Sequence, residues 1–167
     1  MQNHFELFQL VPQFELDQGQ LDAAYRQIQA RVHPDKFVNA GSAEQRVAMQ
    51  WATRANEAYQ ILKSPLRRAS YICELHGVEL QAESNTAMPA AFLMQQMEWR
   101  EELDEARTDV AALLRLETEL RDAQRQQIDK IANQMAKSDY HEAAQSVRQL
   151  MFLEKFGADL AHIADQF

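Results

Sequence analysis

Cysteine is almost absent from this chain of 167 residues, and this scarcity excludes several kinds of site. Cys73 is the only cysteine, so the chain can form neither an internal disulfide nor a cysteine-based metal site by itself. We therefore expect a reducing compartment. The five histidines do not have the spacing of metal ligands either, so neither a metal nor another cofactor is expected.

Glycine and proline are also scarce, with four of each, whereas alanine, glutamine, leucine, glutamate and arginine abound. This composition favours helices and predicts an all-α protein. The chain contains no run of about eighteen apolar residues, which a membrane span requires. Residues 1–9 lack the basic segment and apolar run of a signal peptide. We therefore expect no secretion and no association with a membrane.

Basic residues are outnumbered, with 17 Lys and Arg against 25 Asp and Glu. Residues 1–75 carry eight of each, so the whole acidic excess lies in the C-terminal half. An acidic surface repels phosphate backbones, so nucleic-acid binding is not expected there. No glycine-rich phosphate loop and no recognisable nucleophile motif is present, and we do not expect an enzyme.

Apolar residues recur at helical spacing in most of the chain. Asp17, Ser42 and Ser64 are predicted to cap helices, and Trp51 and Leu75 are predicted to lie on buried stripes. The pattern indicates helices over residues 4–10, 17–33, 42–62, 64–77, 90–106, 109–137 and 139–165.

The helical pattern lapses between residues 77 and 89, where polar and small residues gather. We interpret this stretch as a linker between two domains. Residues 1–76 form the first domain, and three antiparallel helices in residues 90–167 are expected to form a bundle.

The tripeptide His33-Pro34-Asp35 occupies the loop between two amphipathic helices. By chance, such a tripeptide occurs in about one chain of this length in a hundred. Taken alone, it can be an ordinary turn in which Asp35 caps and His33 ends a helix. For a binding role, Pro34 fixes the backbone, Asp35 offers a carboxylate to a partner cation, and His33 offers a ring that packs or hydrogen bonds.

The surroundings of this tripeptide, including Tyr25-Arg26, Arg31-Val32 and the stretch Ala55-Asn56-Glu57-Ala58-Tyr59, make residues 1–76 similar to a J-domain. This resemblance implies an antiparallel helical hairpin with short helices that docks on a DnaK-type chaperone ATPase in its ATP-bound form. The residues implied in chaperone binding are His33, Pro34 and Asp35, with Arg26, Arg31 and Lys36 as further candidates. Solvated basic residues are nevertheless normal on any amphipathic helix.

Residues 91–105 and 147–155 resemble the C-terminal domain of the HscB family, so the resemblance spans both predicted domains. It implies a co-chaperone of iron–sulfur cluster assembly that stimulates the ATPase of HscA and brings it the scaffold protein IscU. Some members carry an N-terminal cysteine pair that binds metal, which is absent here. We therefore expect a bacterial cytoplasmic protein.

One face of the helix over residues 90–106 carries apolar residues that a bundle core cannot easily cover together with the Phe92 and Trp99 stripe. Exposed apolar clusters mark interfaces, and methionines adapt to irregular partners. The alternative is that these residues are ordinary core and that the nearby acids are a solvated face. The apolar run 150–153 spans most of a helix circumference, so one member, Phe152, is also predicted to face outward. The family resemblance implies that this face binds IscU through Leu93, Met94, Met97, Glu98, Glu101, Glu105 and Phe152.

Two other functions remain open from the sequence. A J-domain co-chaperone for another client shares the first domain but would not bind IscU. A non-catalytic helical scaffold, in which the tripeptide is accidental, would have no effect on a chaperone ATPase.

Overall fold

The computed structural model describes residues 2–80 and 88–167 of the chain. Within these residues every regular element is a helix and no β-strand forms, so the prediction of an all-α protein is confirmed. The chain divides into two compact units, of which the first ends at Ile72 and the second begins at Cys73.

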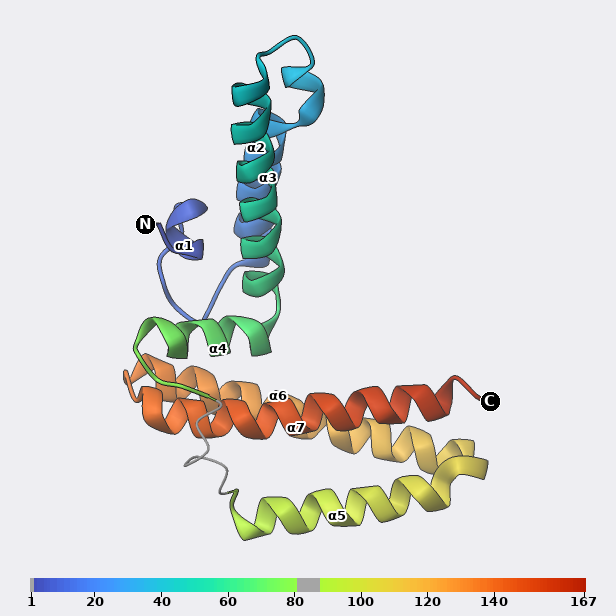
Figure 1. Cartoon of the computed structure of the whole chain (residues 1–167). Helices are drawn as coiled ribbons and strands as arrows, with labels where there is room; N and C mark the ends of the chain where they lie inside the picture. Colours follow the sequence, from blue (N-terminus) through green and yellow to red (C-terminus); the bar gives the residue numbers. More distant parts are fainter. Residues whose placement is uncertain (1, 81–87) are drawn as a thin grey trace. The chain divides into compact units, whose positions relative to one another are not determined.

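The first unit is a helical hairpin with shorter helices around it (Figure 1). Helices α2 and α3 run antiparallel and are joined by the 3₁₀ helix η1, and α1 packs on α3. The elements are α1 (His4–Leu7), α2 (Gln18–Val32), η1 (Pro34–Phe37), α3 (Ser42–Lys63) and α4 (Pro65–Leu75), whose last residues belong to the second unit.

Two of the three predicted caps of this unit form. The Asp17 carboxylate accepts hydrogen bonds from the backbone N–H groups of Gly19 and Gln20, at 2.8 and 3.3 Å. Ser64 Oγ accepts one from the N–H of Arg67 at 3.2 Å. These bonds satisfy N–H groups that have no partner within the helix, which fixes where α2 and α4 begin.

The predicted cap at Ser42 is wrong, because Ser42 is the first residue of α3 and Gly41 occupies the capping position. Gly41 O accepts the first helical hydrogen bond, from the N–H of Gln45 at 3.0 Å. The Gln45 side chain turns back to the loop and donates to the carbonyl of Phe37 at 2.9 Å, so it does not complete a capping box. The start of α3 is therefore fixed by Gln45.

The first helix is shorter than predicted. It ends at Leu7, because Gln9 adopts a left-handed backbone with φ 56° and the chain turns before Leu10. The apolar residues that it contributes are nevertheless buried. The core of the first unit consists of Phe5, Leu7, Phe8, Phe14, Leu21, Ala48, Ala55, Ala58, Leu62, Ala69 and Ile72.

Trp51 and Leu75, which the sequence predicts to be buried, are both exposed. The buried line of α3 follows Ala48 and Ala55, so the large ring of Trp51 lies beside that line and remains 39% exposed. The guanidinium of Arg54 covers part of the ring, at 5.6 Å from its centroid. Leu75 is the last residue of α4, where less of the helix remains to cover it.

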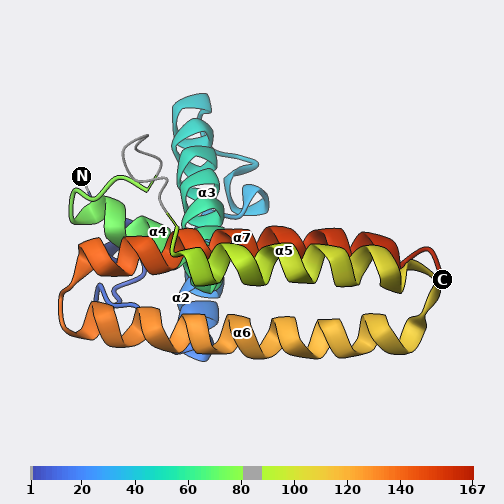
Figure 2. The same ribbon diagram turned by 90° about the horizontal axis from the view of Figure 1, so that it is seen from below.

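The second unit is a three-helix bundle, as predicted (Figures 1 and 2). Helices α6 and α7 lie side by side along their length, and α5 reaches α6 through the 3₁₀ helix η3. Asp109 and Asp139 cap α6 and α7 by accepting backbone hydrogen bonds. The elements are α5 (Ala90–Glu105), η3 (Ala106–Thr108), α6 (Val110–Ala136) and α7 (Tyr140–Ala164).

Part of the stretch that the sequence assigns to a linker is structured. Val78 and Leu80 are buried within the second unit. Arg148 of α7 donates from Nε to the carbonyl of Leu80 at 2.7 Å and from Nη2 to the carbonyl of Glu79 at 3.3 Å. The rest of the predicted linker includes residues 81–87, which lie outside the described residues.

No helix in the described ranges has both the length and the apolar character needed to cross a membrane. In the same ranges, no three His, Cys, Asp or Glu side chains are grouped so that they could hold a metal ion.

Candidate functional site

The loop between α2 and η1 has a defined backbone. His33 ends α2 in an extended conformation, with φ −59° and ψ 134°, because a following proline disfavours the helical region. Pro34 then starts η1, where its missing N–H costs nothing. His33 Nδ1 accepts a hydrogen bond from the backbone N–H of Asp35 at 3.2 Å, and His33 O accepts one from Lys36.

These bonds use the loop backbone and one nitrogen of the His33 ring. With Nδ1 used as an acceptor, Nε2 of the neutral His33 ring is left to donate. The Asp35 side chain is 88% exposed, and one carboxylate oxygen lies 3.5 Å from His33 Nδ1. We call His33, Pro34 and Asp35, all of which are exposed, the His-Pro-Asp loop.

The three basic candidates are also exposed, and they lie on both sides of this loop. Arg31 is in the last turn of α2, and Lys36 is in η1. Arg26 lies seven residues before His33, which corresponds to about 10 Å along a helix. A partner that meets the loop and the end of α2 together can therefore reach all three cations.

The hairpin that carries the loop is held by a ladder of polar and aromatic side chains, which the sequence analysis missed. Tyr59 on α3 donates from its hydroxyl to Asp22 on α2 at 2.8 Å. The rings of Tyr25 and Tyr59 stack with centroids 4.1 Å apart, and Tyr25 donates from its hydroxyl to Asn56. The hydrogen bond from Tyr59 is the main cause that lowers the pKa of Asp22, and it raises the pKa of Tyr59.

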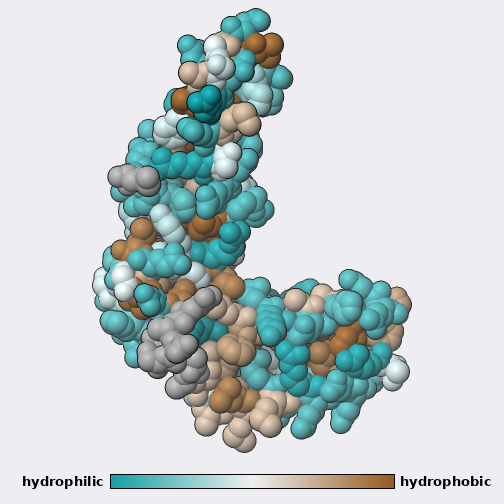
Figure 3. All heavy atoms as spheres, in the orientation of Figure 1, coloured by the Kyte–Doolittle hydropathy of each residue, from teal (hydrophilic) through white to brown (hydrophobic). Residues whose placement is uncertain are grey.

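The second candidate surface lies on α5 and α7. Leu93, Met94 and Met97 are 45%, 61% and 65% exposed, and Phe152 on α7 is 46% exposed. We call these four residues the α5–α7 patch. Phe92 joins its two parts, because its half-buried ring meets the Phe152 ring edge-on at 6.4 Å. Figure 3 shows apolar residues gathered over the N-terminal end of α5.

The predicted core stripe of α5 explains why this patch faces outward. Trp99, Leu103 and Ala106 are buried, and the Trp99 ring packs against Phe156 of α7 at 5.5 Å. Arg100 donates to Asp159 at 2.7 Å, with its guanidinium over the Phe156 ring. This side of α5 is thereby fixed against α7, and Leu93, Met94 and Met97 remain outside.

The acidic candidates Glu98, Glu101 and Glu105 are exposed along α5. Glu105 also lines a polar pocket of about 530 Å³ together with Glu102 and Glu119. Partial desolvation, followed by the charges of Glu119, Glu98 and Glu105, raises the pKa of Glu102. A dense negative field therefore accompanies the apolar patch along this helix.

The fold and these two surfaces define the class of protein: an all-helical chain with a J-domain hairpin followed by a helical bundle. Comparison with known proteins narrows this class. Residues 88–161 match the family model described as the HSCB C-terminal oligomerisation domain.

Two curated relatives, both called co-chaperone protein HscB homolog, are similar over nearly the whole chain. The protein of Burkholderia thailandensis is 54% identical over 95% of this chain and 91% of its own length. That of Bordetella petrii is 53% identical over 95% and 94%.

Solved structures of HscB proteins are also similar to this chain. The chaperone HscB from Vibrio cholerae is 39% identical with a TM-score of 0.88, covering 99% of both chains. Human co-chaperone protein HscB is 27% identical with a TM-score of 0.92, covering 96% of this chain and 81% of that one. The chain belongs to the HscB family of co-chaperones, as its sequence motifs predicted.

Proposed function

We propose that this protein stimulates the ATPase of the DnaK-type chaperone HscA and delivers the scaffold protein IscU to it, which promotes maturation of iron–sulfur proteins in the bacterial cytoplasm. The observation that carries this proposal is the exposed His-Pro-Asp loop, whose Asp35 side chain is 88% exposed at the start of η1. Membership of the HscB family supports it.

The loop acts on the chaperone through charge and shape. Asp35 accepts charge-assisted hydrogen bonds from a cation of the ATP-bound chaperone, and the exposed Arg26, Arg31 and Lys36 meet acidic groups around it. Loss of one member of a desolvated charge pair typically costs about 2–5 kcal/mol. The Asp35→Asn variant therefore loses stimulation while the backbone bonds of the loop remain.

The α5–α7 patch holds the client. Its exposed methionine, leucine and phenylalanine side chains offer adaptable apolar area, which desolvation on binding converts into affinity. Glu98, Glu101 and Glu105 attract a basic rim on IscU and speed its association. One chain thus brings client and ATPase together, and hydrolysis then traps the client on the chaperone.

The chaperone half of the proposal is tested by steady-state ATP hydrolysis of purified HscA with increasing amounts of this protein. The parent is expected to raise the rate in a saturable way, and Asp35→Asn is expected not to. Circular dichroism controls for folding. If the parent leaves the rate unchanged, the chaperone half is wrong and the protein is a helical scaffold of another kind.

The client half is tested by calorimetric titration of IscU with a Leu93→Ala/Met97→Ala/Phe152→Ala variant. A matched control is Val110→Ala/Leu114→Ala, which removes exposed apolar side chains from α6, outside the patch. The patch variant is expected to lose binding and the control to keep it. A parent that stimulates HscA without binding IscU would instead serve another client.

A second function of the same patch is self-association, favoured by the oligomerisation named in the matching family description. Light scattering during size-exclusion chromatography tests it. A dimer of the parent that the triple variant converts to a monomer would support this function, and a monomeric parent would reject it.

A further inference from the structure

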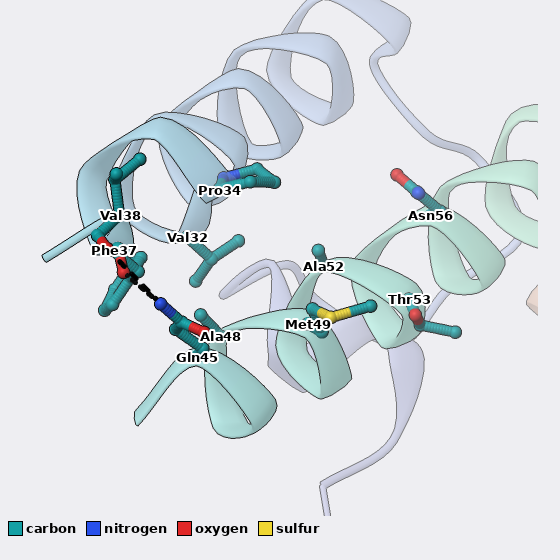
Figure 4. Close-up of a pocket in the computed structure, with 10 residues that line it drawn as sticks. All are labelled: Val32, Pro34, Phe37, Val38, Gln45, Ala48, Met49, Ala52, Thr53 and Asn56. Atoms are coloured by element: carbon teal, nitrogen blue, oxygen red, sulfur yellow. Dashed lines mark hydrogen bonds between the residues drawn. The ribbon is translucent and has the colours of Figure 1, made fainter. Parts of the chain in front are cut away.

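A groove in the hairpin adjoins the His-Pro-Asp loop (Figure 4). It runs between the end of α2 and the first half of α3 and has a volume of about 470 Å³. Among its lining residues are Val32, Pro34, Phe37, Val38, Ala48 and Ala52. The groove is therefore mainly apolar and open to solvent at the functional end of the hairpin.

The groove is held open at both ends by hydrogen bonds. At its outer end, Gln45 Nε2 donates to the carbonyls of Phe37 at 2.9 Å and Ala40 at 3.3 Å. At its inner end, Asn56 accepts from the Tyr25 hydroxyl, which also accepts from Gln29 at 2.9 Å. These bonds fix the separation of the two helices between which the groove lies.

Small residues leave the space unfilled. Ala48 and Ala52, whose side chains are single methyl groups, line the groove from α3 (Figure 4). Ala48 is the only buried residue of the chain between residues 42 and 54. At the rim, Val38 is 68% exposed, and Met49 is exposed to a similar extent. A well-packed hairpin would bury such side chains, so this end lacks apolar partners of its own.

We propose that this groove seats an apolar side chain of the same chaperone ATPase that docks on the His-Pro-Asp loop. The proposal rests on the proposed function and deepens it. The groove is continuous with the loop, because Pro34 belongs to the loop and also lines the groove. A partner that reaches Asp35 therefore also covers the groove.

The charges around the groove define the segment that fits. Residues 26–46 carry four basic side chains, Arg26, Arg31, Lys36 and Arg46, against the acidic Asp35 and Glu44. This segment of the hairpin therefore has a formal charge of +2, within a chain of net charge −8. The matching segment of the chaperone has one or two apolar side chains flanked by acidic residues, which basic groups around an apolar groove favour.

The most specific test fills the groove with a larger side chain of this protein. Ala52→Leu adds a side chain that occupies the space, and Met49→Gln makes its rim polar. Both are expected to raise the concentration for half-maximal stimulation of HscA by about tenfold, the equivalent of losing one buried apolar contact. The maximal rate is expected to stay that of the parent, because Asp35 is untouched.

Ala43→Leu is the matched control. Ala43 lines a neighbouring apolar hollow together with Val47 and Trp51. This hollow shares Val32, Phe37 and Ala48 with the groove but contains neither Met49 nor Ala52. The same change of size there is expected to leave half-maximal stimulation unchanged. An Ala52→Leu variant that stays helical and behaves as the parent, or an equal effect of Ala43→Leu, overturns the groove proposal.

A second readout reports contact directly. The only cysteine, Cys73, is buried, so a cysteine introduced in place of Met49 can be alkylated selectively. ATP-bound HscA is expected to protect Met49→Cys at least several-fold more than Val47→Cys at the other hollow. Equal rates with and without HscA would contradict the proposal. If the parent stimulates HscA but HscA does not protect Met49→Cys, the groove proposal alone is wrong. If the parent does not stimulate HscA, the proposed function is wrong.

Discussion

Arg148 and Leu80 are 68 residues apart, yet Arg148 Nε donates to the Leu80 carbonyl at 2.7 Å within the second unit. The guanidinium is almost fully buried and also reaches the carbonyl of Glu79. Burying a charged group is costly unless it is hydrogen bonded, and the bonds from Nε and Nη2 offset this cost in part, since Nη1 has no partner among the described residues. This pair therefore anchors the segment that leaves α4 to the face of α7.

Removal of this anchor tests its contribution. Arg148→Ala is expected to lower the free energy of unfolding by about 2–4 kcal/mol, because two buried carbonyls lose a charged donor and a cavity forms. Urea denaturation followed by circular dichroism measures the change. The exposed Arg125→Ala is the control and should change the stability by less than about 0.5 kcal/mol. Similar values for both variants would show that Arg148 anchors nothing.

Each unit contains one tryptophan, so the two rings allow the packing of the two units to be compared. Trp99 is 5% exposed and contacts Phe156, whereas Trp51 is 39% exposed. Trp99→Ala is expected to cost about 3–5 kcal/mol in the second unit, and Trp51→Ala clearly less. Denaturation curves of the two variants give the comparison. An equal loss would mean that Trp51 is packed in solution.

Cys73 makes stability depend on pH in alkaline solution. Burial raises the pKa of its thiol from 9.0 to about 11, so the folded chain keeps the proton longer than the unfolded chain. The stability that this provides is complete below pH 9 and is lost as the pH rises from 9 to 11. Cys73→Ala should flatten this part of the curve of unfolding free energy against pH. If the slope of this curve is unchanged in the variant, a group other than Cys73 causes the pH dependence.

Asp22 makes stability depend on pH in acidic solution, and here stability falls as the pH falls. The hydrogen bond from Tyr59 lowers the pKa of Asp22 below its ordinary value of 3.8. Its contribution to stability is therefore present above that value and disappears as the pH falls through the lowered pKa. Tyr59→Phe removes the donor, so the difference between the thermal midpoints of parent and variant should be larger at pH 6 than in strong acid. A constant difference would contradict this.

Much of the fold follows from local sequence signals. Asp17, Ser64, Asp109 and Asp139 begin helices where short polar side chains can accept backbone N–H groups, and Pro34 ends α2. The patch was also visible in the sequence, because one helix face cannot bury both Trp99 and Met97. These caps and helix faces depend on residues that are close to one another in the sequence.

What the sequence did not reveal depends on distant contacts. The Asp22–Tyr59 hydrogen bond and the bond from Arg148 to Leu80 each join residues far apart in the chain. Apolar periodicity also places Trp51 inside, because it cannot tell the edge of a stripe from its centre. The groove exists because α3 has alanines at residues 48 and 52, and a small residue in a helical pattern looks like ordinary core.

The central claim is that one chain carries both the chaperone surface and the client surface. The most direct test measures the extra HscA ATPase rate that IscU adds, with the parent, with Asp35→Asn, with the Leu93→Ala/Met97→Ala/Phe152→Ala variant, and with an equimolar mixture of the two variants. Only the parent is predicted to give this increment, because neither variant can link client to chaperone. A mixture that restores the increment would contradict the claim.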